Sequence, residues 1–180
     1  VLSSMLPRRM LNGLFGRDLS RINGTLQALL EGQQSVDVVS EHHLTGRMKD
    51  WPVIVVAECD YLEPAFKKEL IGYVENGGNL LIIGPQAAGM FAAELGVVPQ
   101  GAPQSETRYL EHGGALVATQ DLWQAGILDA RVQIVGTIRE KNDAASSGLP
   151  AATIMHLGKG KIAATWRPRR NSRSRSRLRA

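Results

Sequence analysis

The chain has 180 residues, of which 43% are apolar and 5% aromatic, which is enough for one core and gives no sign of a second. Its single cysteine, Cys59, excludes an internal disulfide and any metal site built from cysteines. No apolar run approaches the ~20 residues of a membrane span, so we expect a soluble protein without a membrane partner, and a cytoplasmic location is favoured.

The formal net charge of +4 comes from the C-terminal end. Seven arginines and no acidic residue lie within 167–180, and the rest of the chain carries a formal charge of −3. We therefore divide the chain into an α/β domain at 1–166, which can be a fragment of a longer chain, and an Arg/Ser tail at 167–180 that we expect to be disordered. A cloning junction or a shifted reading frame explains the abrupt change after Trp166 better than a functional tail does.

The first fifty residues predict a strand end at 1–3, a loop at 7–18 and then a helix at 21–31. In that helix, we expect a buried side made of Ile22, Leu26, Leu29 and Leu30, and Gly32 follows the helix. A short strand at 36–39 and a connector or short helix at 42–50 complete this part.

Residues 51–85 change their hydrophobic period twice. The run at 53–56 is β-branched and unbroken, as in a strand buried on both faces, and the run at 80–83 is similar. Between them, 63–76 has helical spacing, with Pro64 suited to the first turn and Gly77 to the C-cap. These features predict a right-handed βαβ unit in which the two strands are adjacent inner strands of a sheet.

The pattern beyond Pro85 mixes helical and strand signals. It predicts a hairpin with its turn at 158–160 and strands at 151–157 and 161–165. The other expected elements are a helix at 87–95, a loop at 99–104, paired strands at 106–111 and 115–118, a helical turn at 120–127 and a strand at 132–139. The fold class that we predict is α/β, a flavodoxin-like three-layer sandwich with a mostly parallel central sheet and a C-terminal β-hairpin.

Two stretches resemble a known family. The segment YVENGGNLLIIGP at 73–85 and the segment PAATIMHLGKGKIAAT at 150–165 are similar to motifs of class I glutamine amidotransferase-like domains, of the β-galactosidase trimerisation-like kind attached to bacterial glycoside hydrolases. The resemblance implies the fold predicted above. Neither motif is catalytic, so it supports the fold more than the function.

A working amidotransferase of this class carries a cysteine on the turn between a buried strand and the next helix, where backbone N–H groups favour the thiolate. Here that turn is Gly84-Pro85-Gln86, which holds no nucleophile, so we expect that glutaminase chemistry is lost. Cys59 follows the preceding strand without a histidine at a recognisable spacing, and we interpret it as a half-buried free cysteine.

Three acids follow the strand at 53–56: Glu58, Asp60 and Glu63. Open α/β sheets bind ligands at the carboxyl ends of their strands, and two carboxylates ~5 to 9.5 Å apart there can hydrolyse a glycoside. Solvated acids at the start of the following helix are the simpler interpretation, because negative charge stabilises a helix N-terminus.

The histidines and the glycine-rich turn do not predict a cofactor or a metal. His42 and His43 are adjacent and, on a strand, would point to opposite sides, while His112 and His156 have no second ligand at a familiar spacing. Residues 158–161 lack the frame of a phosphate-binding loop.

Three functions remain open. The first is a non-catalytic accessory domain of a carbohydrate-active enzyme, for subunit association or for shaping a substrate cleft, with other subunits or a glycoside hydrolase catalytic domain as partners and a carbohydrate as an optional ligand. The second is a free-standing glycoside hydrolase that uses Glu58 and Asp60, with Glu63 in reserve. The third, in which the Arg-rich tail binds nucleic acid, is the one that we favour least.

Overall fold

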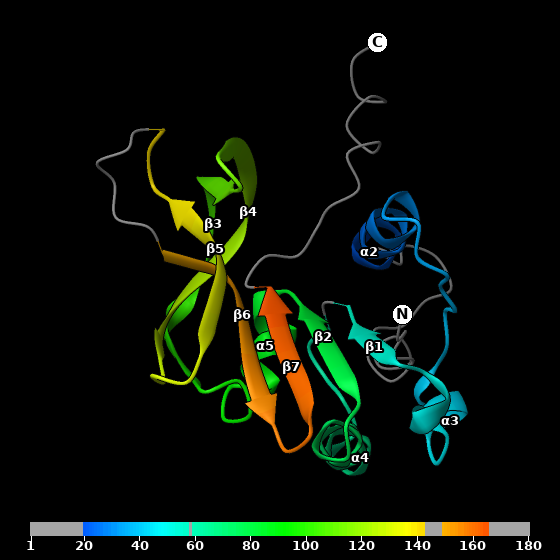
Figure 1. The fold of residues 1–180 in the computed structure, drawn as a ribbon. Coiled ribbons are helices and arrows are strands. Elements are labelled where there is room, and N and C mark those ends of the chain that lie inside the picture. The colour runs from blue at the N-terminus through cyan, green and yellow to red at the C-terminus, as the bar shows by residue number, and fades with distance from the viewer. Residues whose placement is uncertain (1–19, 58, 143–148, 166–180) are drawn as a thin grey trace.

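The structure, a computed structural model, describes residues 20–57, 59–142 and 149–165. Four α-helices, one 3-10 helix and seven strands make up this part of the chain (Figure 1). In order they are α2 (Ser20–Glu31), α3 (Glu41–Leu44), η1 (Met48–Asp50), β1 (Val53–Val56), α4 (Pro64–Glu75), β2 (Asn79–Ile83), α5 (Pro85–Met90), β3 (Val97–His112), β4 (Ala115–Leu128), β5 (Gln133–Arg139), β6 (Leu149–Leu157) and β7 (Gly160–Thr165).

The strands form one sheet in the order β1-β2-β7-β6-β5-β3-β4. Only β1, β2 and β7 run parallel to one another, and every other pairing is antiparallel. The prediction of an α/β fold is confirmed, but the prediction of a mostly parallel sheet is wrong. The reason is local: two-residue turns such as Gly113-Gly114 and Gly158-Lys159 join consecutive strands, and such short turns connect antiparallel neighbours only.

The predicted βαβ unit is confirmed as β1-α4-β2, with Ile54 opposite Leu80 in a parallel register. However, β1 is the last strand of the sheet on this side among the described residues, so its expected inner position is not confirmed. Its side chains from Ile54 onward are nevertheless buried, because helices cover its faces, and Leu44 of α3 and Met48 of η1 belong to the same core cluster. An unbroken apolar run in a strand therefore indicates that both of its faces are covered, and it does not require a central place in the sheet.

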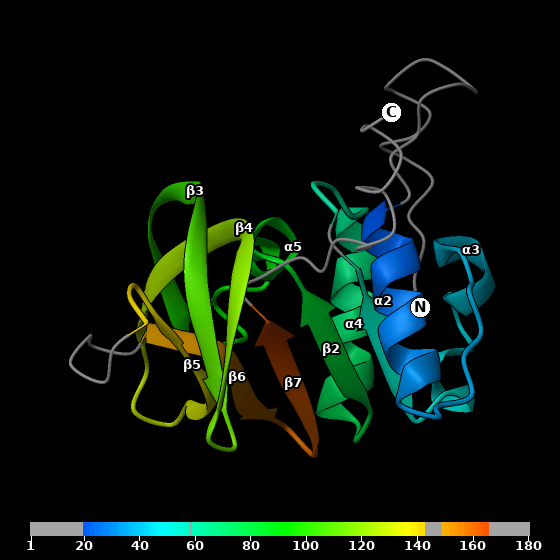
Figure 2. The same cartoon turned by 90° about the horizontal axis from the view of Figure 1, so that it is seen from above.

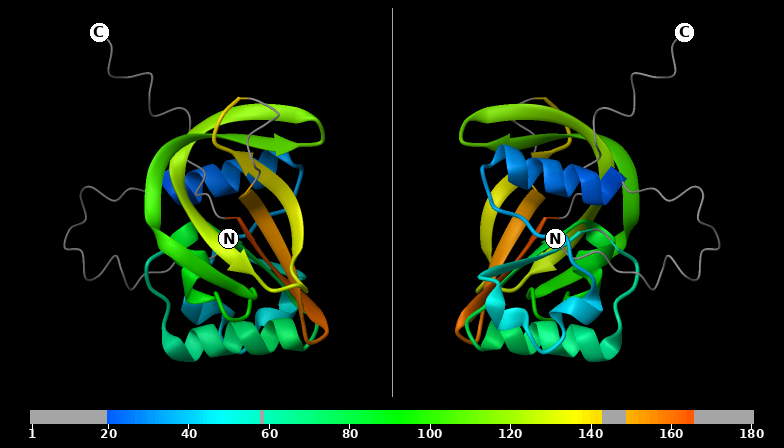
Figure 3. Two further views of the ribbon diagram at one scale, coloured as in Figure 1. Left: turned by 90° about the vertical axis from the view of Figure 1, so that its left-hand side faces the viewer. Right: turned by 90° about the vertical axis from the view of Figure 1, so that its right-hand side faces the viewer.

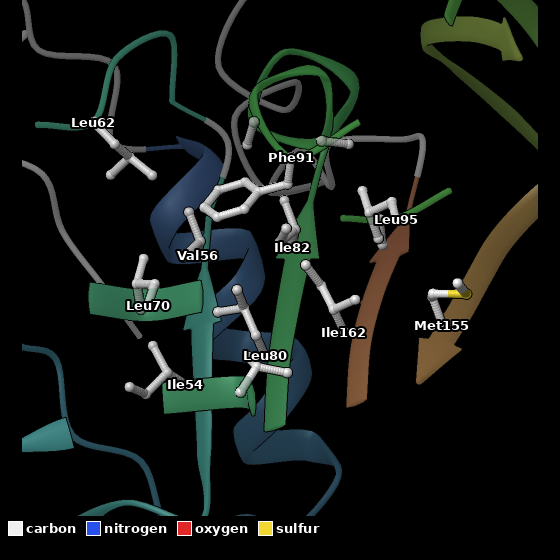
Figure 4. Close-up of a cluster of buried hydrophobic side chains, with 14 of the residues drawn as sticks. Ile54, Val56, Leu62, Leu70, Leu80, Ile82, Phe91, Leu95, Met155 and Ile162 are labelled. Atoms are coloured by element: carbon white, nitrogen blue, oxygen red, sulfur yellow. The ribbon is translucent and has the colours of Figure 1, made fainter. Parts of the chain in front are cut away.

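Helices lie on both sides of the parallel strands, as Figure 3 shows, with α4 on one side and α2 on the other. The main core lies on the α4 side, where strand residues meet Leu70 of α4 and Phe91 after α5, while α2 is seen behind the strands (Figure 4). The strand residues in this core are Ile54, Val56, Leu80, Ile82, Met155 and Ile162. A smaller, separate cluster consists of Trp123 of β4, Ile138 of β5 and Ala151 of β6.

The C-terminal hairpin, which was predicted correctly, packs against the end of α4. Pro64 is at the start of this helix, and Gly77 follows it with φ +112°, as its sequence indicated. The backbone N–H of Lys159 then donates to the carbonyl of Glu75 at 3.0 Å. A Cβ on Gly160 would lie 2.0 Å from the carbonyl oxygen of Gly78, so only glycine allows this close contact.

Several local predictions were wrong. Residues 120–127 are not a helical turn but part of β4, because their backbone pairs with β3 over 98–107. The expected loop at 99–104 belongs to β3, the expected strand at 36–39 is reduced to a single bridge residue, Val39, and α5 begins and ends earlier than 87–95. Leu30, expected on the buried side of its helix, is exposed at the end of α2. The predicted strand end at 1–3 and the tail at 167–180 lie outside the described residues.

Candidate functional site

The loop that joins β1 to α4 carries the predicted acids. Asp60 and Glu63 are both exposed, and Glu58 lies outside the described residues, so the spacing of a carboxylate pair is not defined. Glu63 is the residue before α4, and its side chain forms no capping hydrogen bond in this structure. Leu62 is buried between them and fixes the loop against the core. The role of the three acids in glycoside hydrolysis stays a prediction.

Cys59 lies in the same loop and is half-buried, packed at the margin of the main core. This environment agrees with its interpretation as a free cysteine with a structural place.

The turn after β2 occupies the place where an amidotransferase of this class carries its nucleophile. Gly84 has φ +101°, and its N–H donates to the carbonyl of Thr165 in β7 at 2.9 Å. Pro85 is buried as the first residue of α5, and Gln86 is exposed. The turn therefore has the strand-to-helix geometry of a nucleophile site, but its three side chains offer no thiol, hydroxyl or carboxyl group.

A cavity of about 430 Å³ lies on the side of the sheet that α2 only partly covers. In β2, Leu80 and Ile82 point to the main core and are fully buried, whereas Leu81 and Ile83 line the cavity and are only half-buried. Figure 2 shows α2 on one side of this region and the β3-β4 hairpin on the other. Most of the remaining lining is apolar, from Ala28, Leu29, Leu110, Trp123, Val135, Ala151 and Ala152.

One polar atom in this cavity is unusual. Thr25 of α2 is 1% exposed, and its hydroxyl has no hydrogen-bond partner among the described residues. A buried hydroxyl without a partner is destabilising, and the other hydroxyl residue of the lining, Thr165, is half-buried. Sequence reasoning missed this cavity because its lining comes from α2 and from six different strands, and no local pattern joins them.

The β3-β4 hairpin presents apolar side chains to solvent at both of its ends. Val98 and Ile127 are cross-strand neighbours that are 60% and 62% exposed, and Leu116 and Val117 lie near the turn. We call the cross-strand pair Val98 and Ile127 the hairpin surface. Within the described part of the chain, strand β4 is also the last strand of the sheet on this side, and its fourteen residues include a single charged one, Asp121. A long edge strand with so little charge is prone to pair with another chain.

The paired histidines lie on α3 and not on a strand, so the reason given for separating them is wrong. Their ring centroids are 4.1 Å apart, and the hydroxyl of Ser40 lies 2.9 Å from Nδ1 of His42 and 2.7 Å from Nδ1 of His43. Within the described ranges, no group of three or more His, Cys, Asp or Glu side chains is placed to hold a metal ion. His156 is exposed on β6.

In the part of the chain that the structure describes, no helix combines the length and the apolar character needed to cross a membrane. No protein-family model matches the sequence. No curated protein sequence matches it either.

Solved structures with the same fold exist among glycoside hydrolases. A β-galactosidase from Rahnella sp. R3 matches with a TM-score of 0.71 and 14% identity over 96% of this chain. An exo-β-1,4-mannosidase from an Opitutaceae bacterium matches with a TM-score of 0.64 and 14% identity over 87% of this chain. The chain spans 28% of the first enzyme and 29% of the second.

A ThuA-like protein from Bacteroides uniformis also matches, with a TM-score of 0.61 and 13% identity, over 86% of this chain and 78% of that one. At these identities the likeness concerns the fold. The predicted resemblance is thus confirmed at that level: the chain has the fold of the amidotransferase-like domain that makes up about a quarter of GH42 β-galactosidases.

Proposed function

We propose that this chain is a non-catalytic accessory domain of a carbohydrate-active enzyme. Its role would be subunit association, or the shaping of a substrate cleft on a neighbouring catalytic domain. The observation that carries the proposal is that its fold recurs as one part, about a quarter of the length, of glycoside hydrolases with another 70% or more of chain around it. A cytoplasmic location stays a prediction.

Two features of the described residues support a docking role over catalysis. The turn Gly84-Pro85-Gln86 keeps its geometry without a nucleophile. The hairpin surface exposes apolar side chains next to an edge strand, which is the kind of surface that protein partners cover. Of the partners proposed, a second copy of the chain suits this edge best, because two β4 strands can pair antiparallel and extend the sheet across both copies.

The 430 Å³ cavity fits the same role. Its lining is mainly apolar, with a single buried hydroxyl at Thr25, so it suits an apolar side chain of a partner better than a sugar with many hydroxyl groups.

Sedimentation velocity from ~1 to ~100 μM tests association directly, in the concentration range over which weak homodimers form. We expect the average mass to rise with concentration. The double substitution Val98→Glu and Ile127→Glu should keep the chain monomeric, because it places charge on the apolar cross-strand pair. Leu30→Glu, which changes an exposed apolar residue of α2, is the matched control and should still associate.

A monomer at every concentration would contradict association through copies of this chain and would leave the cleft-shaping role. Association that survives the double substitution would contradict the assignment to the hairpin surface.

A further inference from the structure

A second cavity, of about 150 Å³, lies at an irregularity in β3. Gln100 pairs with Ala125 and Gln104 pairs with Trp123, so three residues of β3 stand opposite the single residue Gln124 of β4. This bulge pushes β3 outward and opens a hollow against β5 and β6. Gly101 permits it with φ +66°, and the side-chain amide nitrogen of Gln124 donates to the Gly101 carbonyl at 2.8 Å.

One wall of this cavity is polar and rigid. The guanidinium of Arg108 contacts the carboxylate of Glu106 and, at 2.8 Å, the carboxylate of Glu140. The Arg108 side chain is 16% exposed, and its two ion pairs hold the guanidinium in position. The hydrogen bond to Glu140 also raises the pKa of the guanidinium. One positive charge thus lies between two negative ones, which leaves a net negative charge, and Gln104 adds an amide at the rim.

The opposite wall is apolar. Ile138, Leu149 and Pro150 line it, and Trp123 forms its floor at 7% exposure. The indole N–H of Trp123 donates to the carbonyl of Glu106 at 3.1 Å, which fixes the ring relative to the polar wall.

We propose that this cavity binds one neutral pyranose unit of a saccharide. A pyranose has hydroxyl groups that both donate and accept hydrogen bonds, and a face of C–H groups. Carboxylate, guanidinium and amide side chains supply matching acceptors and donors, and the apolar wall receives the C–H face. The volume corresponds to about five water molecules, which is the space of one sugar ring and not of a chain of them.

The charge of the polar wall selects against other small ligands. An anion would have to compete with Glu106 and Glu140 for Arg108 and would meet a net negative site. A purely apolar ligand would leave the polar wall without partners. This proposal goes beyond the accessory role, because association through the hairpin surface needs no ligand. Saccharide binding and association of the chain are also measured in separate experiments.

The test is a titration of the ¹⁵N-labelled chain with methyl β-D-galactopyranoside and methyl α-D-mannopyranoside, followed by NMR. We expect saturable shifts of the Gln124 side-chain amide and the Trp123 indole N–H with a millimolar dissociation constant for at least one of the two. Arg108→Gln should weaken binding tenfold or more. Gln104→Ala, which changes an exposed side chain and leaves the ion pairs intact, should weaken it several-fold.

Gln133→Ala is the control, since Gln133 is an exposed glutamine outside this cavity, and it should bind as the unchanged chain does. No saturable shift with either glycoside at 50 mM would overturn the proposal. Unchanged binding in the Gln104→Ala variant would also overturn it, and so would equal shifts with sodium phosphate, which would indicate an anion site.

Discussion

The contact between the C-terminal hairpin and helix α4 predicts that a substitution of Gly160 lowers the stability of the domain. A Cβ at this position would lie 2.0 Å from the carbonyl oxygen of Gly78 and 2.3 Å from that of Val74. Both obstacles are backbone atoms, so no side chain can rotate to make room. Gly160→Ala must therefore move the hairpin away from α4 or distort β7 beside it.

The expected loss of stability follows from these contacts. Inserting one methyl group against fixed neighbours costs about 1–3 kcal/mol. Moving the turn also weakens the bond from Lys159 N–H to the Glu75 carbonyl, which is worth about 1 kcal/mol. A total of roughly 2–4 kcal/mol is a large part of the 5–15 kcal/mol by which domains are stable, and it corresponds to a melting temperature lower by roughly 5–15 °C.

Gly72→Ala is the matched control in the same assay. A Cβ on Gly72, in the middle of α4, meets nothing within 4 Å, so the change to alanine should stabilise the helix by about 0.5–1 kcal/mol. Thermal melting and urea unfolding of the three proteins give both numbers. Equal stability of Gly160→Ala and the unchanged chain would refute the described packing of the hairpin on α4.

The remaining predictions concern a buried hydroxyl, an ion pair and the tail. Thr153 is fully buried in β6, and its hydroxyl has no partner among the described residues, so Thr153→Val should leave stability unchanged or raise it by about 1 kcal/mol in urea unfolding; a clear loss would mean that the hydroxyl is bonded. Hydrogen bonds from the Arg131 side chain, and then from its backbone N–H, lower the pKa of Asp129 from 3.8 to about 2. The stabilisation from this pair should thus be complete above pH ~4 and vanish as the pH falls through about 2, and an NMR titration of the Asp129 carboxyl with a midpoint near 3.8 would contradict the pairing. Deleting residues 168–180 should leave the melting temperature unchanged and remove any weak binding to RNA or DNA, and a loss of several degrees would show that the tail packs on the domain.

The parts of the fold that were predicted correctly are those whose signal is local. The β1-α4-β2 unit and the β6-β7 hairpin carry period changes, a proline at a helix start and glycines at turns within one short stretch. Only the first part of strand β4 was predicted. Residues 120–127 pair with 98–107 of β3, and such pairing overrides local propensity.

The cavities were beyond sequence reasoning for the same reason. Trp123 lines both the 430 Å³ and the 150 Å³ cavity, yet its sequence neighbourhood indicated a helical turn. The bulge at Gly101 was visible only as a loop signal, and the partners of Arg108 come from β3 itself and from the end of β5. The acids at 58, 60 and 63 were found by their place after a strand, which is a property of the fold and does not by itself define a reaction.

The central claim is that the chain assists an enzyme and does not catalyse. The most direct measurement is turnover by the purified chain of aryl β-galactosides, aryl β-mannosides and glutamine, with Cys59→Ser, Glu58→Gln and Asp60→Asn variants measured beside it. We expect all four proteins to give the rate of the buffer alone. Turnover by the unchanged chain that falls by orders of magnitude in Glu58→Gln or Asp60→Asn, while the melting temperature stays the same, would contradict it and establish these carboxylates as catalytic.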